Sequence, residues 1–236
     1  MGTIPSAILV GREIAQEVIV RYNCRDRSMS RMISDFLGMA AAGIRNVIIA
    51  TGDPAPFGPY PDPTAVLDLD SIGLANVLAR LNRGEDPGGG EVDPATSFVV
   101  GVELDPGPID LRAEARRFRW KVDAGADFAV TRPVFDDVAL VELLDQVAGG
   151  GREIPIVASV YPLTSLREAE YLAQEVPGVR VPDSVLTRMD AADKLGIAAA
   201  REVGVQIAVE VVQALRARIA GVGVSQRSER CECEKG

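Results

Sequence analysis

Short apolar runs alternate along this chain with longer stretches in which apolar and polar residues mix. The apolar runs fall at residues 18–23, 46–51, 97–104, 127–132, 154–163 and 221–226. They are rich in β-branched and aliphatic residues, which is typical of buried strands. The mixed stretches fall at residues 28–43, 71–84, 110–125, 136–151, 165–178, 183–196 and 197–220. In the second of them apolar residues stand at 72, 74, 77, 78 and 81, the spacing of a helix with one buried face.

This alternation predicts an α/β fold in which helices cover a parallel sheet. Two architectures are compatible with it: an open doubly wound sheet and a (β/α)8 barrel. Neither a G-x-G-x-x-G nor a G-x-x-x-x-G-K-[ST] motif follows the first strand, which weighs against a nucleotide-binding open sheet. Six predicted strands are two fewer than a complete barrel requires.

Polar side chains gather where the predicted strands end. These positions are Asn23, Arg25, Asp26, Thr51, Gly52, Asp53, Glu103, Asp105, Thr131, Arg132, Tyr161, Ser225 and Gln226. The carboxyl ends of parallel strands share one rim, so a side chain such as Arg132 is predicted to face a common pocket there. An arginine that caps a helix or braces a loop is the competing interpretation.

Composition and charge exclude some kinds of binding partner. The net charge is −9 and the sequence pI is about 4.7, which argues against nucleic acid and against a basic membrane-surface helix. The sequence has no apolar run of 18 residues, and we expect neither a membrane span nor a signal peptide. There is no histidine, so proton transfer would use carboxylates, lysine, tyrosine or water.

Cysteines and carboxylate clusters do not predict a metal site. Three cysteines suit a reducing compartment, and we expect a cytoplasmic protein. Cys24 lies in an apolar stretch and is expected to be buried, whereas Cys231 and Cys233 stand in a polar tail and cannot complete a zinc site by themselves. The carboxylates of Asp62, Asp68 and Asp70 are expected to cap loops.

Four long stretches resemble the barrel core of methylenetetrahydrofolate reductases, most nearly the type fused to a homocysteine S-methyltransferase in some bacteria. They are YNCRDRSMSRMISDFLGMAAAGIRNVIIATGDPAPFGPYPD, TAVLDLDSIGLANVLARLNRGEDPGG, RFRWKVDAGADFAVTRPVFD and IPIVASVYPLTSLREAEYLAQEVPGVRVPDSVL. With the helix that ends near Ile219, the resemblance covers nearly the whole chain. It implies a (β/α)8 TIM barrel that holds FAD at its rim, here incomplete with about six of the eight strands.

The family reaction, as the resemblance implies it, passes hydride from NAD(P)H through FAD to 5,10-methylenetetrahydrofolate and yields 5-methyltetrahydrofolate. Asp53 matches an aspartate beside the flavin and the folate, and it is the predicted catalytic residue. Thr51 and Gly52 match backbone that approaches the cofactor. Glu114, Arg117 and Lys121 match a helix that meets its diphosphate and ribose.

The chemistry of these residues agrees with such roles. A carboxylate can accept hydrogen bonds from pterin N–H groups, and a lysine can offset diphosphate charge. Asp53 as a turn residue before Pro54, and Lys121 as a helix residue that merely extends to the surface, remain alternatives.

Two features depart from the family pattern. Arg132 stands where the family has a glutamine that contacts folate, so we expect Arg132 to be a substrate-binding residue of altered chemistry. The two strands that precede the first one here, with the glutamate that acts as the acid in relatives, are not found. We therefore predict an N-terminally truncated barrel domain at 1–226 with a disordered tail at 227–236. Three explanations of the missing strands stay open: a start upstream of Met1, another chain that supplies the strands or covers the edges, or a decayed or repurposed copy. The two open edges favour a homo-oligomer or a partner chain that completes the barrel.

Three functions follow from these observations. The first is a methylenetetrahydrofolate reductase-type flavoprotein. The second is a non-catalytic or partner-dependent subunit that binds folate or flavin. The third is another (β/α)8 enzyme acting on a one-carbon carrier, with Arg132 remaking the substrate site.

Overall fold

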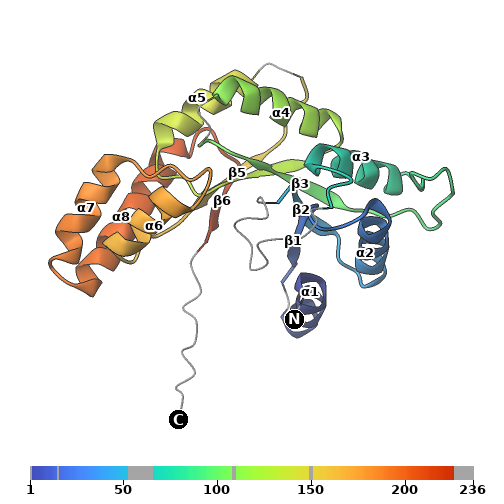
Figure 1. The fold of residues 1–236 in the computed structure, drawn as a ribbon, viewed down its shortest axis with the longest axis horizontal. Helices are drawn as coiled ribbons and strands as arrows, with labels where there is room; N and C mark the ends of the chain where they lie inside the picture. The colour runs from blue at the N-terminus through green and yellow to red at the C-terminus, as the bar shows by residue number, and fades with distance from the viewer. Residues whose placement is uncertain (1, 15, 53–65, 108–109, 149–150, 226–236) are drawn as a thin grey trace, which may run out of the picture. The chain divides into compact units, whose positions relative to one another are not determined.

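The computed structural model describes residues 2–14, 16–52, 66–107, 110–148 and 151–225. Within these ranges the chain alternates strands with helices (Figure 1). The strands are β1 (Ile19–Asn23), β2 (Asn46–Ala50), β3 (Val99–Leu104), β4 (Phe128–Thr131), β5 (Ile156–Val160) and β6 (Gly221–Val224). The helices are α1 (Thr3–Glu13), α2 (Met29–Ala41), α3 (Ser71–Leu81), α4 (Leu111–Asp123), α5 (Asp137–Val147), α6 (Leu166–Glu175), α7 (Asp183–Asp193) and α8 (Ile197–Leu215).

The six strands form one parallel sheet whose order follows the chain from β1 to β6. Tyr22 of β1 lies opposite Ile49 of β2, and Ala158 of β5 lies opposite Val222 of β6. Neighbouring parallel strands joined through helices are the arrangement of a (β/α)8 barrel. The prediction of an α/β barrel fold with six of its eight strands is confirmed.

The chain divides into two compact units. The first contains residues 1–104, 112–130 and 146–156, and the second contains residues 105–111, 131–145 and 157–236. In the first, α2 buries Met32, Phe36 and Met39, which lie three or four residues apart on one helix face. The Phe36 ring lies 4.7 Å from that of Tyr22 on β1. The apolar face of α2 therefore packs onto this end of the sheet.

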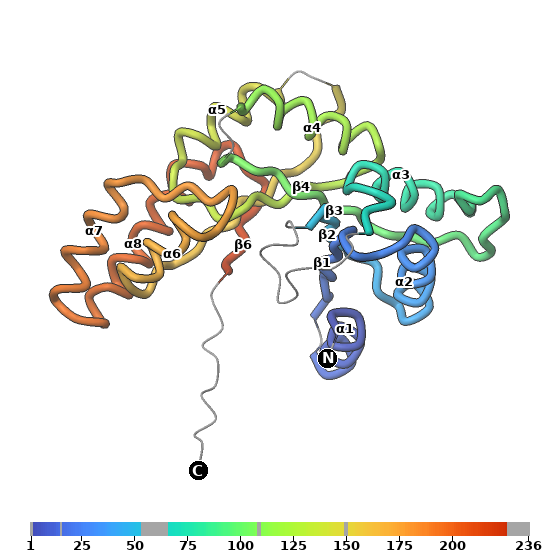
Figure 2. The backbone as a smooth tube through the Cα atoms, in the orientation of Figure 1, coloured from blue at the N-terminus to red at the C-terminus, as the bar shows by residue number. Residues whose placement is uncertain are grey.

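The second unit has a core of its own. Phe135, Leu163, Leu172, Met189 and Ile207 are among its buried residues. Helices α6, α7 and α8 lie side by side around this core, as the tube in Figure 2 shows. The core includes Leu163, which follows β5, so the helical layer packs against the segment after that strand.

Helix starts and loop carboxylates follow the predicted capping chemistry. Asp70 caps α3 by accepting hydrogen bonds from the backbone N–H groups of Ile72 and Gly73. Asp68 accepts a hydrogen bond of 2.9 Å from the backbone N–H of Met29. The prediction that these two carboxylates cap loops is confirmed, whereas Asp62 lies outside the described residues.

Several boundaries differ from those predicted from the sequence. Helix α1 was not predicted, because its polar and apolar residues do not recur at a clear helical spacing that would distinguish a helix from a loop. Strand β5 is shorter than the predicted run at 154–163, because Pro155 and Pro162 flank it and proline has no N–H to donate to a sheet. The last helix ends at Leu215, five residues before the predicted end at 220. None of these shifts changes which strand ends carry polar residues.

The prediction that Cys24 is buried is confirmed, since its side chain has no exposed surface. In the described part of the chain, no helix is both long and apolar enough to cross a membrane. The proposed domain of residues 1–226 and the tail at 227–236 stay predictions, since residues 226–236 are outside the described ranges.

Candidate active site

The first candidate region lies where β1 and β2 end in the first unit. The backbone N–H of Arg25 donates to the carbonyl of Thr51 at 3.0 Å, which extends the β1–β2 pairing by one step. The Thr51 hydroxyl lies 3.2 Å from the Ser71 hydroxyl and accepts from the Ser71 N–H, so it ties the strand end to the start of α3. Gly52 follows with a φ of +96°, a backbone angle that side chains rarely allow.

At this turn the backbone of Gly52 lies very close to the side chain of Arg25. A Cβ on Gly52 would lie 3.0 Å from the Cβ of Arg25. The turn therefore favours glycine at position 52, because a side chain there would crowd Arg25 and because glycine adopts this φ without strain. The predicted catalytic residue, Asp53, lies outside the described residues.

The second region joins the end of β3 to α4. The Lys121 ammonium group donates to the carbonyl oxygen of Glu103 at 2.7 Å and lies 3.5 Å from the Glu114 carboxylate. Lys121 and Glu114 are only 5% and 8% exposed, so this is a nearly buried ion pair. Burial lowers the pKa of Lys121, the Glu114 carboxylate opposes that fall, and the Arg117 guanidinium adds to it.

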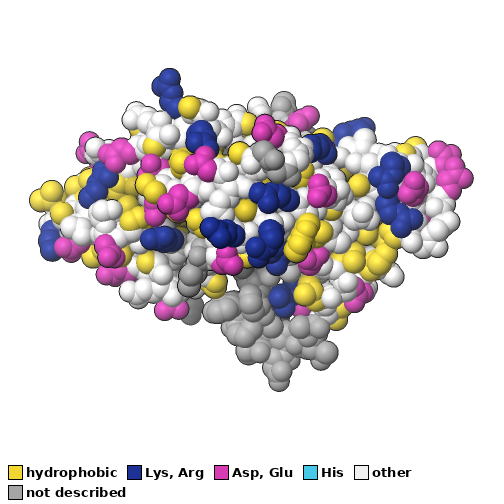
Figure 3. Space-filling view, turned by 90° about the horizontal axis from the view of Figure 1, so that it is seen from above, with side chains coloured by type: hydrophobic (Ala, Val, Ile, Leu, Met, Phe, Trp, Pro, Cys, Tyr) yellow, Lys and Arg dark blue, Asp and Glu magenta, His cyan; other side chains and the backbone are white. Residues whose placement is uncertain are grey.

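Exposed positive charge lies beside this buried pair. Arg117 is exposed and forms no ion pair or hydrogen bond with a described residue. Arg21 of β1 pairs with the Glu103 carboxylate. Figure 3 shows dark-blue side chains gathered over α4. The predicted cofactor-binding residues Glu114, Arg117 and Lys121 thus form one cluster on α4.

The third region belongs to the second unit and surrounds Arg132, which follows β4. The Arg132 Nε lies 3.4 Å from Asp105 Oδ2, and its Nη1 donates to the carbonyl of Pro177. The side chains of Arg132 and Asp105 are 23% and 22% exposed. The guanidinium therefore links the loop after β3 to the turn after α6.

Two glycines make this link sterically feasible. Gly178 has a φ of +77°, and a Cβ there would lie 2.6 Å from Asp105 Oδ2 and 3.1 Å from Arg132 Nη1. A Cβ on Gly107 would overlap the carbonyl of Gly178. The Gly107 N–H also donates to Asp105 Oδ1 at 2.9 Å. Any larger residue at either position would separate the two loops that Arg132 joins.

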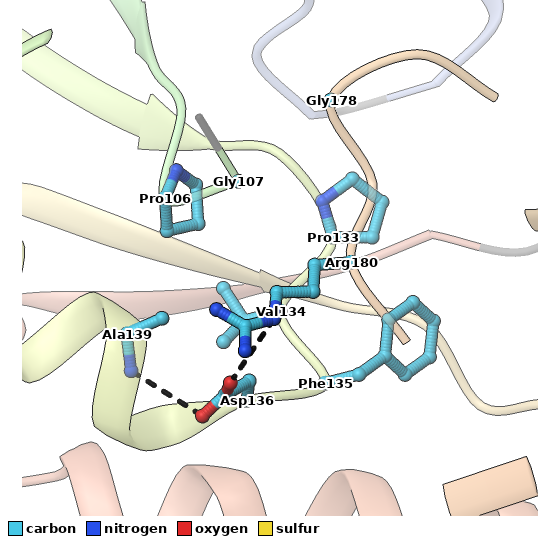
Figure 4. Close-up of a pocket in the computed structure, with 9 residues that line it drawn as sticks. All are labelled: Pro106, Gly107, Pro133, Val134, Phe135, Asp136, Ala139, Gly178 and Arg180. Atoms are coloured by element: carbon cyan, nitrogen blue, oxygen red, sulfur yellow. Dashed lines mark hydrogen bonds and ion pairs between the residues drawn. The ribbon is translucent and has the colours of Figure 1, made fainter. Parts of the chain in front are cut away.

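A shallow pocket adjoins this link and shares both glycines with it (Figure 4). Its walls are formed by Pro106, Gly107, Pro133, Val134, Phe135, Asp136, Ala139, Gly178 and Arg180. Asp136 accepts from the Ala139 N–H at the start of α5, and its other oxygen lies 3.8 Å from Arg180 Nε. The pocket is mainly apolar, with one ion pair across it.

Tyr161 follows β5 and is held by a local network. Its hydroxyl donates to Glu168 Oε1 at 2.7 Å, while Glu168 Oε2 accepts from the N–H and the hydroxyl of Thr164. The Tyr161 ring centroid lies 6.5 Å from that of Phe135. This network fixes the start of α6 and the loop beyond β5.

The predicted site residues thus fall in both units. Thr51, Gly52, Glu114, Arg117 and Lys121 lie in the first unit, and Arg132 lies in the second. Reasoning from the sequence missed the Asp105 partner of Arg132, although both had been placed at strand ends. The Asp-x-Gly pattern after β3, with opposite charges on consecutive strands, was the signal that could have suggested the pair. Among the described residues, no group of three His, Cys, Asp or Glu side chains is arranged to hold a metal ion.

Comparison with known proteins places these features in a family. The methylenetetrahydrofolate reductase family model matches residues 3–224. The 5,10-methylenetetrahydrofolate reductase of Pectobacterium carotovorum is 25% identical over 199 residues, which cover 84% of this chain and 61% of that protein. The enzyme of Escherichia coli is 25% identical over 207 residues, which cover 81% of this chain and 66% of that protein. The chain thus spans less than two thirds of the length of these relatives.

Solved structures share the general fold only weakly. An uncharacterized protein from Clostridium thermocellum, described as binding two copies of 5-methyl-5,6,7,8-tetrahydrofolic acid, aligns with a TM-score of 0.48 and 14% identity over 94% of this chain and 81% of its own. Tryptophan synthase from M. tuberculosis aligns with a TM-score of 0.40 and 16% identity over 88% of this chain and 66% of its own. These scores are too low to support an argument about function.

The assignment therefore depends on the sequence match, which extends across all six strands and both units. The matched range includes the stretches whose resemblance to this family was noted from the sequence. The chain belongs to the methylenetetrahydrofolate reductase family.

Proposed function

We propose that this protein is a flavoprotein reductase that transfers hydride from NAD(P)H through FAD to 5,10-methylenetetrahydrofolate, giving 5-methyltetrahydrofolate. The observation that carries the proposal is the family match over residues 3–224. Family membership supports a folate-related reductase, and the cofactor, the electron donor and the reaction are the proposed part. The three cysteines suit the cytoplasmic location that the proposal includes.

The residues of the first unit fit the anionic cofactor that the family implies. FAD carries a diphosphate, and Lys121 is a buried cation whose three donors are not exhausted by the Glu103 carbonyl and the Glu114 carboxylate. Arg117 adds an exposed guanidinium on the same helix. Gly52 offers close approach without a side chain in the way. Bound FAD would supply the hydride relay between nicotinamide and folate.

The chain's own residues would then bind and orient the cofactor and the folate. Lys121 and Arg117 would hold the diphosphate, and Glu114 would keep the Lys121 ammonium group in position. Thr51 would fix the turn before Gly52 through its contacts with Ser71. We propose Asp53 as the residue that accepts hydrogen bonds from the pterin.

Arg132 is proposed as the substrate-side residue of the second unit. Its guanidinium is cationic and donor-only, whereas the glutamine of the family can both donate and accept. Asp105 neutralises part of its charge at 3.4 Å. The substrate group that meets Arg132 should therefore be an acceptor, such as a carbonyl or a carboxylate of the folate.

A partner or a second copy of the chain belongs to the same proposal. Strands β1 and β6 stand at the two ends of the strand order. Ile19 of β1 is 51% exposed and Val224 of β6 is 73% exposed. Such edges are usually paired or covered in native proteins. Size-exclusion chromatography with light scattering would show whether the protein associates.

The test of the function is flavin uptake followed by turnover. The purified protein should bind FAD in a one-to-one ratio, and anaerobic addition of NADH or NADPH should bleach the flavin band. Methylenetetrahydrofolate should then restore the band. An Asp53→Asn variant should still take up flavin but reoxidise more slowly with folate. A protein that binds no FAD when titrated with it would refute the proposal.

A further inference from the structure

Arg25 stands at a position that the proposed function has not used. It follows β1 by two residues, and its backbone N–H donates to the Thr51 carbonyl at 3.0 Å. Its Cβ lies 3.0 Å from the place where a side chain on Gly52 would begin. The side chain of Arg25 therefore leaves the backbone directly beside the turn at Thr51 and Gly52.

The guanidinium of Arg25 has no protein partner within the described ranges. Its Nε is buried and has no hydrogen-bond acceptor, and the side chain forms no ion pair there. Buried donors in native structures almost always have an acceptor, so an exception calls for a missing ligand or water. The other two buried orphans, Arg119 Nε and Gln146 Oε1, belong to residues that already bond each other through the Gln146 carbonyl.

Two carboxylates of the first unit are engaged with other residues. Asp35 accepts from the Tyr22 hydroxyl at 2.9 Å and pairs with Arg31 at 2.9 Å and Arg27 at 3.9 Å. Asp70 accepts from two backbone N–H groups of α3. Neither carboxylate pairs with Arg25, whose guanidinium has no acidic partner in the described part of the first unit.

Two other cations of the unit, Lys121 on α4 and Arg21 within β1, differ from Arg25 in having an acidic partner. Lys121 has the Glu114 carboxylate, and Arg21 has that of Glu103. An arginine with a buried and unsatisfied donor is costly unless an acceptor arrives from outside the protein. The chemistry it selects is an anionic or carbonyl oxygen, which a guanidinium binds through fixed N–H groups.

We propose that Arg25 binds an anionic group of the flavin cofactor at the turn of Thr51 and Gly52. The inference rests on the proposed function, because it takes the flavin as the ligand. Two parts of the cofactor share the required chemistry: the diphosphate, and the N1–C2 carbonyl edge of the ring, which gains negative charge on reduction. In either case Arg25 supplies a positive charge that the proposed sites on α4 do not.

The test compares Arg25→Gln with Arg31→Gln in the full chain. Both changes remove one arginine from the same unit, but Arg31 is a surface residue already paired with Asp35. Affinity is measured by quenching of flavin fluorescence with FAD, FMN and riboflavin as probes. Thermal unfolding without flavin is measured alongside, together with an Arg25→Lys variant.

We expect Arg25→Gln to weaken FAD binding by about tenfold or more, the usual effect of losing a charged hydrogen bond. Arg31→Gln should leave it within about twofold, and Arg25→Lys should recover part of the loss. Weakening for FAD but not for riboflavin assigns Arg25 to the phosphates, and equal weakening for all three assigns it to the ring. Without flavin, Arg25→Gln should be no less stable than the wild type, because no described partner is lost.

Three results would overturn the inference. The first is Arg25→Gln binding FAD as tightly as the wild type. The second is equal weakening by Arg31→Gln, which would mean a general effect of charge. The third is a clear loss of stability in flavin-free Arg25→Gln, which would mean a structural role. If the wild-type protein takes up no flavin, the proposed function itself fails and the inference fails with it.

Discussion

Replacing Arg132 with glutamine, the residue that the family pattern has at this position, tests the link between two loops of the second unit. Arg132→Gln removes the ion pair with Asp105 and shortens the side chain that reaches the Pro177 carbonyl. It also leaves the Asp105 carboxylate, only 22% exposed, without this cation. We therefore expect the variant to be less stable than the wild type.

The magnitude follows from the partial burial of the pair. Exposed ion pairs contribute about 0.2–1 kcal/mol, whereas breaking a fully buried pair costs about 3–5 kcal/mol. Arg132 and Asp105 are each less than a quarter exposed, so the pair lies between these limits. We expect a loss of about 2 kcal/mol in the free energy of unfolding. For a chain of this size that corresponds to a fall in Tm of roughly 4–8 °C.

A double-mutant cycle with Asp105→Asn isolates the interaction. Urea unfolding of the wild type, both single variants and the double variant should give a coupling energy of about 1 kcal/mol or more. The matched control is the cycle on Asp190 and Lys194, an exposed pair four residues apart on one helix, for which about 0.3–0.5 kcal/mol is expected. Coupling no larger than that of the control, with Arg132→Gln as stable as the wild type, would refute the idea that Arg132 joins these loops.

Two further predictions use packing and burial. Gly204→Ala should destabilise the protein by about 1–3 kcal/mol, because the new Cβ would overlap the Leu163 carbonyl. Gly38→Ala, also within a helix but with open space around it, should stabilise by about 0.5–1 kcal/mol, so thermal unfolding should show opposite signs. Burial raises the pKa of Cys24 to about 12 from an ordinary value of 9.0, so at pH 8 its thiolate is about a thousandfold less populated. In a chain with both tail cysteines changed to serine, Ellman's reagent should therefore react only after unfolding, and fast reaction of the native protein would contradict the burial.

The chain pattern was sufficient to predict most of the architecture. Apolar runs of strand length, separated by stretches with helical spacing, identified the six strands of the described residues. The inner strands bury most of both faces and so have nearly continuous apolar residues, whereas the edge strands β1 and β6 are partly exposed. Asp70 could also be assigned as a cap, because the preference for a side-chain acceptor before a helix is local. Helix α1 was missed because its residues have no strong periodic signal. The ends of β5 shifted because Pro155 and Pro162 flank the strand.

The cofactor-binding cluster on α4 was predicted in part. Glu114, Arg117 and Lys121 came from resemblance to the family. Their positions on one helix are visible in the sequence, since they are spaced by three and four residues. That Lys121 is nearly buried, and that its ammonium group also meets the carbonyl of Glu103, depends on how α4 packs against the end of β3.

By itself the amino-acid sequence determined the family, the order of strands and helices, and the residue types available at the strand ends. Only the tertiary structure decided which of them meet. Arg132 pairs with Asp105, 27 residues earlier, and bonds Pro177, 45 residues later, because two glycines let distant loops approach. The buried Nε of Arg25 has no hydrogen-bond acceptor among the described residues, although acidic residues stand close to it in the sequence. Such pairing depends on distances in space, which spacing along a chain does not record.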